Sequence, residues 1–221
     1  MTTDDLLRQL YDFTLVGNAP EVLSLTRQGL ELGLGPETLL YEALIPSLEE
    51  VGARFERGDF FVPEMLIAGK AMAGALEILR PLLAETGAQT IGKIVMGTVK
   101  GDVHDIGKNL VNIMFEGAGF EVIDLGVQVA PEKFLAAIQE HQPDIVGFSA
   151  FLTTTMPMFK ANINALQKAG LRDQVIVMVG GAPVTQEYAD VVGADGYAAD
   201  ASAAVVRAKE LIKRRRAVAP A

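Results

Sequence analysis

The hydrophobic period of the sequence changes once, near residue 90, and this change limits the folds that the chain can adopt. Before it, apolar residues recur at steps of three and four, which is the spacing of amphipathic helices. After it, short β-branched runs alternate with helical patterns. A polar connector at 86–90 separates the two patterns, so the sequence predicts two domains, at residues 1–90 and 91–221.

The first pattern predicts four amphipathic helices joined by short loops. Pro36 and Pro63 suit the first turns of the third and fourth helices, where a missing N–H has no partner to lose. Pro46 lies inside the third pattern, where we expect it to kink the helix. Met65 and Met72 lie on the apolar face of the fourth helix and are expected to be core residues. We therefore expect an all-α four-helix bundle cap.

The second pattern predicts five β–α repeats. The expected strands are 94–99, 121–124, 145–149, 175–180 and 196–198, and the expected helices are 106–118, 131–141, 156–169, 186–192 and 201–215. Strands that each return through a helix form a parallel sheet covered on both faces. The predicted class is therefore α/β, a Rossmann-like or flavodoxin-like five-stranded parallel sheet preceded by the helical cap.

Composition excludes several kinds of partner and site. The chain has no cysteine, which excludes disulfides, thiolate zinc sites, iron–sulfur clusters and cysteine nucleophiles. Its formal net charge of −9 argues against nucleic acid or an anionic membrane as the main partner. The uncharged run at 145–159 is too short and too polar to span a bilayer. With no signal-peptide pattern at the start, we expect a cytoplasmic protein.

Unusual residues gather where the strands of such a sheet end, which is where ligands bind in these folds. They occupy 101–109 after the first strand, 149–156 after the third and 180–183 after the fourth. The first segment is not a phosphate-binding P-loop, because five residues separate Gly101 from Gly107 and Asn109 stands where Ser or Thr would hold magnesium.

His104 is the most informative residue in these segments. It is one of only two histidines, and Asp102 precedes it by two positions, so that in extended chain both side chains point the same way. A carboxylate so placed can hold one ring nitrogen and orient the other toward a metal. Since no further ligand set has suitable spacing, a metal would have to arrive held mostly by another group, such as a macrocycle. Gly107 would let the backbone approach a bulky ligand closely.

Three motifs in order give the chain a family resemblance. Asp102-x-His104-x-x-Gly107, then Ser149-x-Phe151, then Gly180-Gly181 resemble the D-x-H-x-x-G, S-x-L and G-G signature of cobalamin-binding domains. The longer run at 98–109 is similar to that of methionine synthase and of corrinoid proteins of methyltransferase systems, and 58–64 resembles the helical cap of the same group.

The resemblance implies a bound cobalamin, as methylcobalamin or a related corrinoid with its cobalt. In the family the dimethylbenzimidazole tail leaves the cobalt and enters a slot beside the sheet, and a histidine replaces it. By this resemblance His104 is the cobalt ligand, Asp102 its hydrogen-bond partner and Thr155 the third member of the relay on which the chemistry depends. The implied cofactor-binding residues besides Asp102 and His104 are Asp105, Ile106, Gly107, Ser149, Phe151, Thr153, Gly180 and Gly181. The leucine of the family's S-x-L element is Phe151 here.

The implied function is that of a methyl carrier, a cofactor-bearing subunit that is not catalytic alone. Its expected partners are a substrate-specific methyltransferase and a second, acceptor-side methyltransferase that passes the methyl group to tetrahydrofolate, a thiol or a similar acceptor, with a reductive activase as a further candidate. The donor stays open among methanol, methylamines, aryl methyl ethers and betaines.

Other interpretations remain beside the methyl carrier. An adenosylcobalamin-dependent isomerase subunit would share the sheet, but that family usually lacks the cap. A cobalamin-sensing regulator would share cap and sheet, but it needs a DNA-binding helix-turn-helix for which no residues remain. A flavodoxin-like module without cobalamin is the third alternative. The threonines at 153–155 could also be an ordinary helix N-cap.

Overall fold

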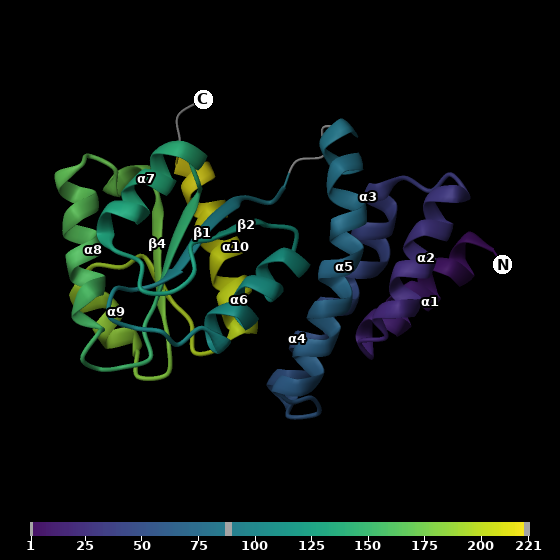
Figure 1. Cartoon of the computed structure of the whole chain (residues 1–221), viewed down its shortest axis with the longest axis horizontal. Helices are drawn as coiled ribbons and strands as arrows, with labels where there is room; N and C mark the ends of the chain where they lie inside the picture. The colour runs from purple at the N-terminus through teal and green to yellow at the C-terminus, as the bar shows by residue number, and fades with distance from the viewer. Residues whose placement is uncertain (1, 87–89, 219–221) are drawn as a thin grey trace. The chain divides into compact units, whose positions relative to one another are not determined.

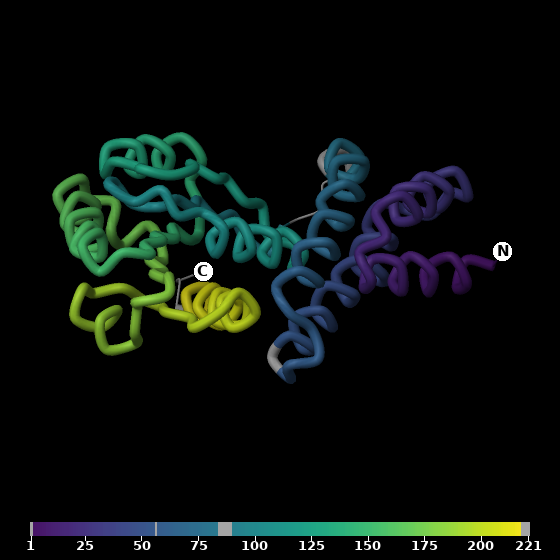
Figure 2. The backbone as a smooth tube through the Cα atoms, turned by 60° about the horizontal axis from the view of Figure 1, so that its bottom comes forward, coloured from purple at the N-terminus to yellow at the C-terminus, as the bar shows by residue number. Residues whose placement is uncertain are grey.

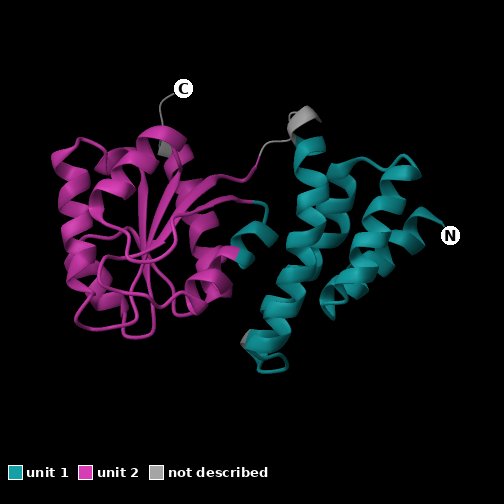
Figure 3. Cartoon of the chain, in the orientation of Figure 1, with its two compact units in different colours: residues 1–89, 113–119 teal, residues 90–112, 120–221 magenta. Residues whose placement is uncertain are grey.

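The computed structural model describes residues 2–86 and 90–218, except for the side chains of residues 56, 84–86 and 218. Their contacts divide the chain into two compact units, coloured separately in Figure 3. Unit 1 comprises Met1–Gln89 and Ile113–Gly119, and unit 2 comprises Thr90–Asn112 and Phe120–Ala221. The segment 113–119 is thus grouped with the helices of unit 1, although it continues a helix that begins in unit 2.

Unit 1 contains the expected N-terminal helices. They are α1 (Thr3–Leu15), α2 (Ala19–Glu31), α3 (Pro36–Leu39), the π-helical turn η1 (Leu40–Leu44), α4 (Ile45–Arg57) and α5 (Val62–Thr86). Thr2 and Asp5 form a capping box at the start of α1. Met65 and Met72 are 0% and 1% exposed, so both are core residues as the sequence predicted.

The predicted kink at Pro46 takes the form of a π-helical turn. A proline inside a continuous helix would clash with the carbonyl four residues earlier and leave it without a donor. The chain instead widens to π-helical hydrogen bonding over Leu40–Leu44, and Pro46 then lies in the first turn of α4.

Unit 2 is a doubly wound α/β fold, shown with the rest of the chain in Figure 1. Its elements are β1 (Lys93–Thr98), α6 (Ile106–Gly117), β2 (Glu121–Asp124), α7 (Pro131–His141), β3 (Ile145–Ser149), α8 (Pro157–Lys168), the 3-10 turn η2 (Arg172–Gln174), β4 (Ile176–Gly180), α9 (Gln186–Val192), β5 (Gly196–Tyr197) and α10 (Ala201–Val218). Most bounds agree with the sequence-based prediction within a residue or two, and α10 continues three residues further.

The sheet has the flavodoxin-like strand order β2-β1-β3-β4-β5, with every pair parallel. Helices α7, α8 and α9 cover one face, while α6 and α10 lie beside each other on the opposite face, as Figures 1 and 2 both show. The chain leaves β1 for β2 on one side and crosses back to β3 on the other. Ligands of such folds bind at this reversal, beside the loops that follow β1 and β3.

Alternation along the strands assigns side chains to the two faces. Val95, Val146, Phe148 and Val177 belong to the core beneath α7–α9. Thr98, Ser149 and Gly180 lie on the other face and are in register with one another across β1, β3 and β4. The last residues of the three strands therefore form one row at the carboxyl edge, on the face that α6 and α10 cover.

Candidate functional site

Asp102 occupies a tight turn directly after β1 and is fully buried. Its N–H donates to the carbonyl of Val99 at 3.1 Å, and the preceding Gly101 has φ +87°, which a residue with a Cβ seldom adopts. The turn leaves the Asp102 carboxylate in the interior, within hydrogen-bond distance of the loop that continues to α6.

One oxygen of this carboxylate holds His104 twice. Asp102 Oδ1 accepts the backbone N–H of His104 at 3.0 Å and lies 2.7 Å from its ring Nδ1. Because an ionised carboxylate can only accept, Nδ1 carries the proton and donates. In a neutral imidazole held in this way the other ring nitrogen, Nε2, carries the lone pair with which a histidine binds a metal.

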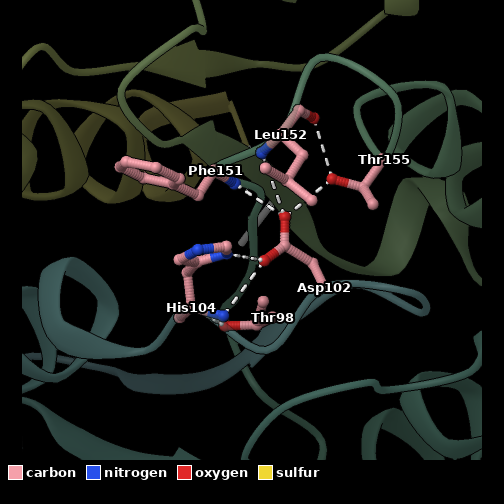
Figure 4. A network of polar contacts seen from close by, with 6 residues as sticks. All are labelled: Thr98, Asp102, His104, Phe151, Leu152 and Thr155. Carbon is pink, nitrogen blue, oxygen red and sulfur yellow. Dashed lines mark hydrogen bonds and ion pairs between the residues drawn. The ribbon is translucent and has the colours of Figure 1, made fainter.

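The other oxygen is held by the loop after β3, as Figure 4 shows. Asp102 Oδ2 accepts the N–H groups of Phe151 at 2.8 Å and Leu152 at 3.2 Å, and the hydroxyl of Thr155 at 2.7 Å. The Thr155 hydroxyl also lies 2.8 Å from the carbonyl oxygen of Leu152. Residues about fifty positions apart thereby converge on one buried carboxylate.

This hydrogen bonding keeps Asp102 ionised in spite of its burial. Burial alone would raise its pKa, since it removes water from the charge. The Thr155 hydroxyl, the backbone and ring of His104 and the Phe151 N–H oppose this, and together they hold the pKa of Asp102 well below its usual range. The site thus contains a fixed negative charge behind the imidazole.

The imidazole of His104 is in contact with an aromatic ring. Phe151 stacks on it with 4.4 Å between ring centroids and 28° between planes. The His104 side chain is nevertheless 44% exposed. Its main chain is fixed as well, because the buried Thr98 hydroxyl donates to the His104 carbonyl at 2.9 Å.

A second buried charge, which the sequence patterns had not indicated, supports the same loop. Lys108, in the first turn of α6, is 3% exposed and its Nζ lies 2.6 Å from Oδ2 of Asp124 at the end of β2. The loop after Asp124 returns to the site, since the N–H of Gln128 donates to the Asp102 carbonyl at 3.0 Å. A lysine at a helix N-terminus, where the dipole disfavours a cation, was the available signal.

The remaining predicted residues lie around this network without joining it. Ile106 is 71% exposed, Thr153 is exposed, and Asp105 is half-buried with its carbonyl accepting the N–H of Asn109. Thr155 does not cap a helix, because Met156 is the N-cap of α8 and receives no side-chain bond there. The roles of these residues toward a cofactor stay predictions.

The site leaves room and surface for a large, partly apolar group. A Cβ built on Gly107 or Gly180 would meet nothing within 4 Å, so protein packing does not account for the lack of a side chain at either position. Val103, Ile106, Phe151 and Leu152, which lie in or next to the loops after β1 and β3, expose apolar side chains, and that of Phe151 stacks on His104. No group of three or more His, Cys, Asp or Glu able to hold a metal occurs in the described part of the chain. The residues therefore fit a metal carried by a macrocycle, to which the protein adds one imidazole.

Comparison with known proteins agrees with this chemistry. Two family models match, both described as a B12 binding domain, one over residues 92–206 and the other over residues 6–80. Within residues 2–86 and 90–218, no helix is long and apolar enough to span a membrane.

Relatives match over nearly the whole length. The dimethylamine corrinoid protein of Methanosarcina barkeri is 42% identical over 96% of this chain and 100% of its own. A chain in the crystal structure of the methanol:cobalamin methyltransferase complex of the same organism superposes with a TM-score of 0.84 and 29% identity, over 95% of this chain and 80% of its own. A cobalamin-binding protein of Desulfitobacterium hafniense gives a TM-score of 0.73 at 29% identity, over 94% and 97% of the two chains. With His104 held by an ionised carboxylate at the edge of a doubly wound sheet, the chain belongs to the B12-binding corrinoid proteins of methyltransferase systems, and its cofactor is a corrinoid.

Proposed function

We propose that this chain is a methyl carrier that binds cobalamin base-off, with Nε2 of His104 as the lower ligand of cobalt. The observation that carries the proposal is the 2.7 Å contact between Nδ1 of His104 and the buried carboxylate of Asp102, which directs Nε2 away from that hydrogen bond and toward a metal. When bound, the corrinoid would supply the cobalt chemistry for methyl transfer between a donor on one partner and an acceptor on another.

The residues of the chain then orient and adjust this ligand. Asp102 increases the electron density of the imidazole through the short Nδ1 hydrogen bond. Thr155 can turn its hydroxyl between Asp102 and the Leu152 carbonyl, which lie at 2.7 and 2.8 Å, so it can strengthen or weaken the negative charge behind His104. The hydrogen bonds of Thr155 and Asp102 can thus adjust when the imidazole binds to cobalt or leaves it, without a movement of the backbone.

We further propose that the nucleotide tail lies beside the row of Thr98, Ser149 and Gly180. These residues end three adjacent strands on the face covered by α6 and α10, and Gly180 has open space where a side chain would stand. A Cβ on Gly181 would overlap the Ala150 carbonyl, so a glycine is what lets the loops after β3 and β4 lie this close at the edge.

The relatives support a methylamine as the source of the methyl group. The 42% identical relative is a dimethylamine corrinoid protein, and the match to the methanol complex has 29% identity. We therefore propose a methylamine methyltransferase as the donor-side partner, with an acceptor-side methyltransferase completing the cycle. The helical unit matches a B12-binding model of its own, which supports a methyl carrier over an isomerase subunit.

Ligation is tested with the chain's only two histidines. The protein is labelled with ¹⁵N-histidine, loaded with cobalamin in its Co(II) form and studied by electron paramagnetic resonance, where ¹⁵N changes the nitrogen coupling from a triplet to a doublet. His104→Ala should lose this coupling and retain cobalamin through the tail, while His141→Ala should keep it. Coupling that survives in His104→Ala would overturn the ligand assignment.

The donor is tested separately. The reduced holo-protein is mixed with a dimethylamine- or a methanol-specific methyltransferase and its substrate, and methylation is followed by the optical spectrum. Methylation with dimethylamine alone supports the proposal, whereas methylation with methanol alone would overturn the choice of donor and leave the carrier role intact.

A further inference from the structure

The aromatic ring of Phe151 occupies a position that the hydrogen-bond network does not require. Phe151 contacts Asp102 through its backbone N–H and not through its ring, and any residue other than proline could supply this N–H. Its side chain is 51% exposed and stacks on the imidazole of His104. A large apolar side chain held half in solvent against a polar ring calls for an explanation beyond core packing.

The hydrogen bond from Nδ1 to Asp102 leaves one freedom of His104 uncontrolled. A single bond at 2.7 Å fixes the position of one ring atom, but the imidazole can still tilt about that point. Tilting moves Nε2, because it lies on the opposite side of the ring. A flat surface against the ring face opposes this motion, and Phe151 supplies such a surface at 4.4 Å and 28°.

The backbone makes this stack rigid. The N–H groups of Phe151 and Leu152 are both anchored on Asp102 Oδ2, while Oδ1 of the same carboxylate holds His104. The two stacked rings therefore belong to chain segments that are both hydrogen-bonded to the buried Asp102 carboxylate. Because the two segments are linked in this way, a small displacement of either one would move both rings together and preserve the stack.

We propose that Phe151 is a positioning residue that sets the plane of the His104 imidazole, so that Nε2 is aimed before the cofactor binds. This inference rests on the proposed ligation by His104. A leucine at this position lacks the flat face and would leave the imidazole free to tilt. Without the stack, cofactor binding itself would have to restrict the orientation of the imidazole. The interaction energy of an aromatic pair therefore sets the expected effect, which is about threefold to tenfold weaker binding of the Co(II) form of cobalamin.

The first test needs no cofactor. In the protein labelled on histidine, the ring protons of His104, assigned by their absence in His104→Ala, should be shifted upfield by the face of Phe151. Phe151→Leu should move them downfield, and Phe151→Tyr should leave them near the wild-type position. Unchanged signals in Phe151→Leu would show that the stack does not form in solution and would overturn the inference.

The second test is a double-mutant cycle that separates positioning from direct contact with the cofactor. Dissociation constants for Co(II) cobalamin are measured for the wild type, Phe151→Leu, His104→Ala and the double variant. If Phe151 acts through His104, Phe151→Leu weakens binding threefold to tenfold in the wild type and has no effect beside His104→Ala. Equal effects in both backgrounds would show that Phe151 only touches the cofactor.

The two tests also separate this inference from the proposed function. Loss of the ¹⁵N coupling in His104→Ala together with additive effects of Phe151→Leu would reject the positioning role alone. Persistence of that coupling would reject the ligation itself. Rescue of both the affinity and the ring-proton shift by Phe151→Tyr would support the inference, since tyrosine restores the flat face.

Discussion

Asp102→Asn is the substitution that tests the site most directly, because it keeps the shape of the side chain and removes its charge. The wild-type carboxylate accepts five hydrogen bonds while fully buried, two on Oδ1 and three on Oδ2. An asparagine offers one oxygen in place of two. Its NH₂ group must therefore face one of these two sets of donors.

The energetically cheaper orientation has a defined chemical consequence. With the NH₂ group on the Oδ2 side, the backbone N–H groups of Phe151 and Leu152 would both lose their acceptor. With it on the Oδ1 side, only the N–H of His104 does, because the imidazole can change tautomer and accept at Nδ1. The proton of His104 then resides on Nε2, where it prevents coordination of a metal.

The expected cost follows from this count. One stranded backbone N–H costs about 1–3 kcal/mol, and three bonds that become neutral lose roughly 0.5–1 kcal/mol each. Relief from burying a charge offsets part of this, so we expect a net loss of about 2–4 kcal/mol in the stability of unit 2. The holo-protein should also lose the ¹⁵N-histidine coupling in its Co(II) form.

The pH dependence has a definite sign. Because the pKa of Asp102 is lowered by folding, its stabilisation is complete above the unfolded pKa of about 3.9 and is lost as the pH falls. At pH 3 the wild type should have lost about 1 kcal/mol of its advantage over Asp102→Asn. Urea unfolding at pH 7 and pH 3, followed by amide hydrogen exchange in β3 and β4, measures this in unit 2. An advantage that does not change with pH would refute the ionised network.

Two pairs of substitutions test the surroundings of the site. Asp124→Asn should cost about 3 kcal/mol in urea unfolding, because it leaves the Lys108 ammonium buried without its carboxylate. Lys108→Met should cost only about 1 kcal/mol, since Asp124 is 39% exposed and water can solvate its carboxylate. Equal costs for the two substitutions would contradict this reasoning. Gly180→Ala should change stability by less than about 0.5 kcal/mol but weaken cobalamin binding about tenfold by filling the proposed slot, and unchanged affinity would remove the slot from this position. Gly181→Ala should instead destabilise the apoprotein by about 3 kcal/mol, because its φ of +129° is strained for alanine and the new Cβ would overlap the carbonyl of Ala150.

The sequence by itself determined the elements and the chemical type of the site. Short apolar runs predicted β1, β3 and β4, because a strand buried on both faces carries apolar residues on both, whereas an amphipathic helix shows an apolar stripe. The spacing of Asp102 and His104 predicted their contact, because residues two positions apart in extended chain place their side chains on the same side. Both inferences rest on interactions within a few residues of each other.

Tertiary structure decided what depends on segments that are distant in the sequence. No local pattern indicates that the N–H groups of Phe151 and Leu152 donate to Asp102, and only the family resemblance linked Thr155 to it. These contacts exist because β1 and β3 are neighbours in the strand order. The same adjacency brings the ring of Phe151 onto His104. Local patterns fix which residues can perform the chemistry, and strand order fixes which of them meet, because hydrogen bonds and ring contacts act over a few ångströms in space irrespective of distance along the chain.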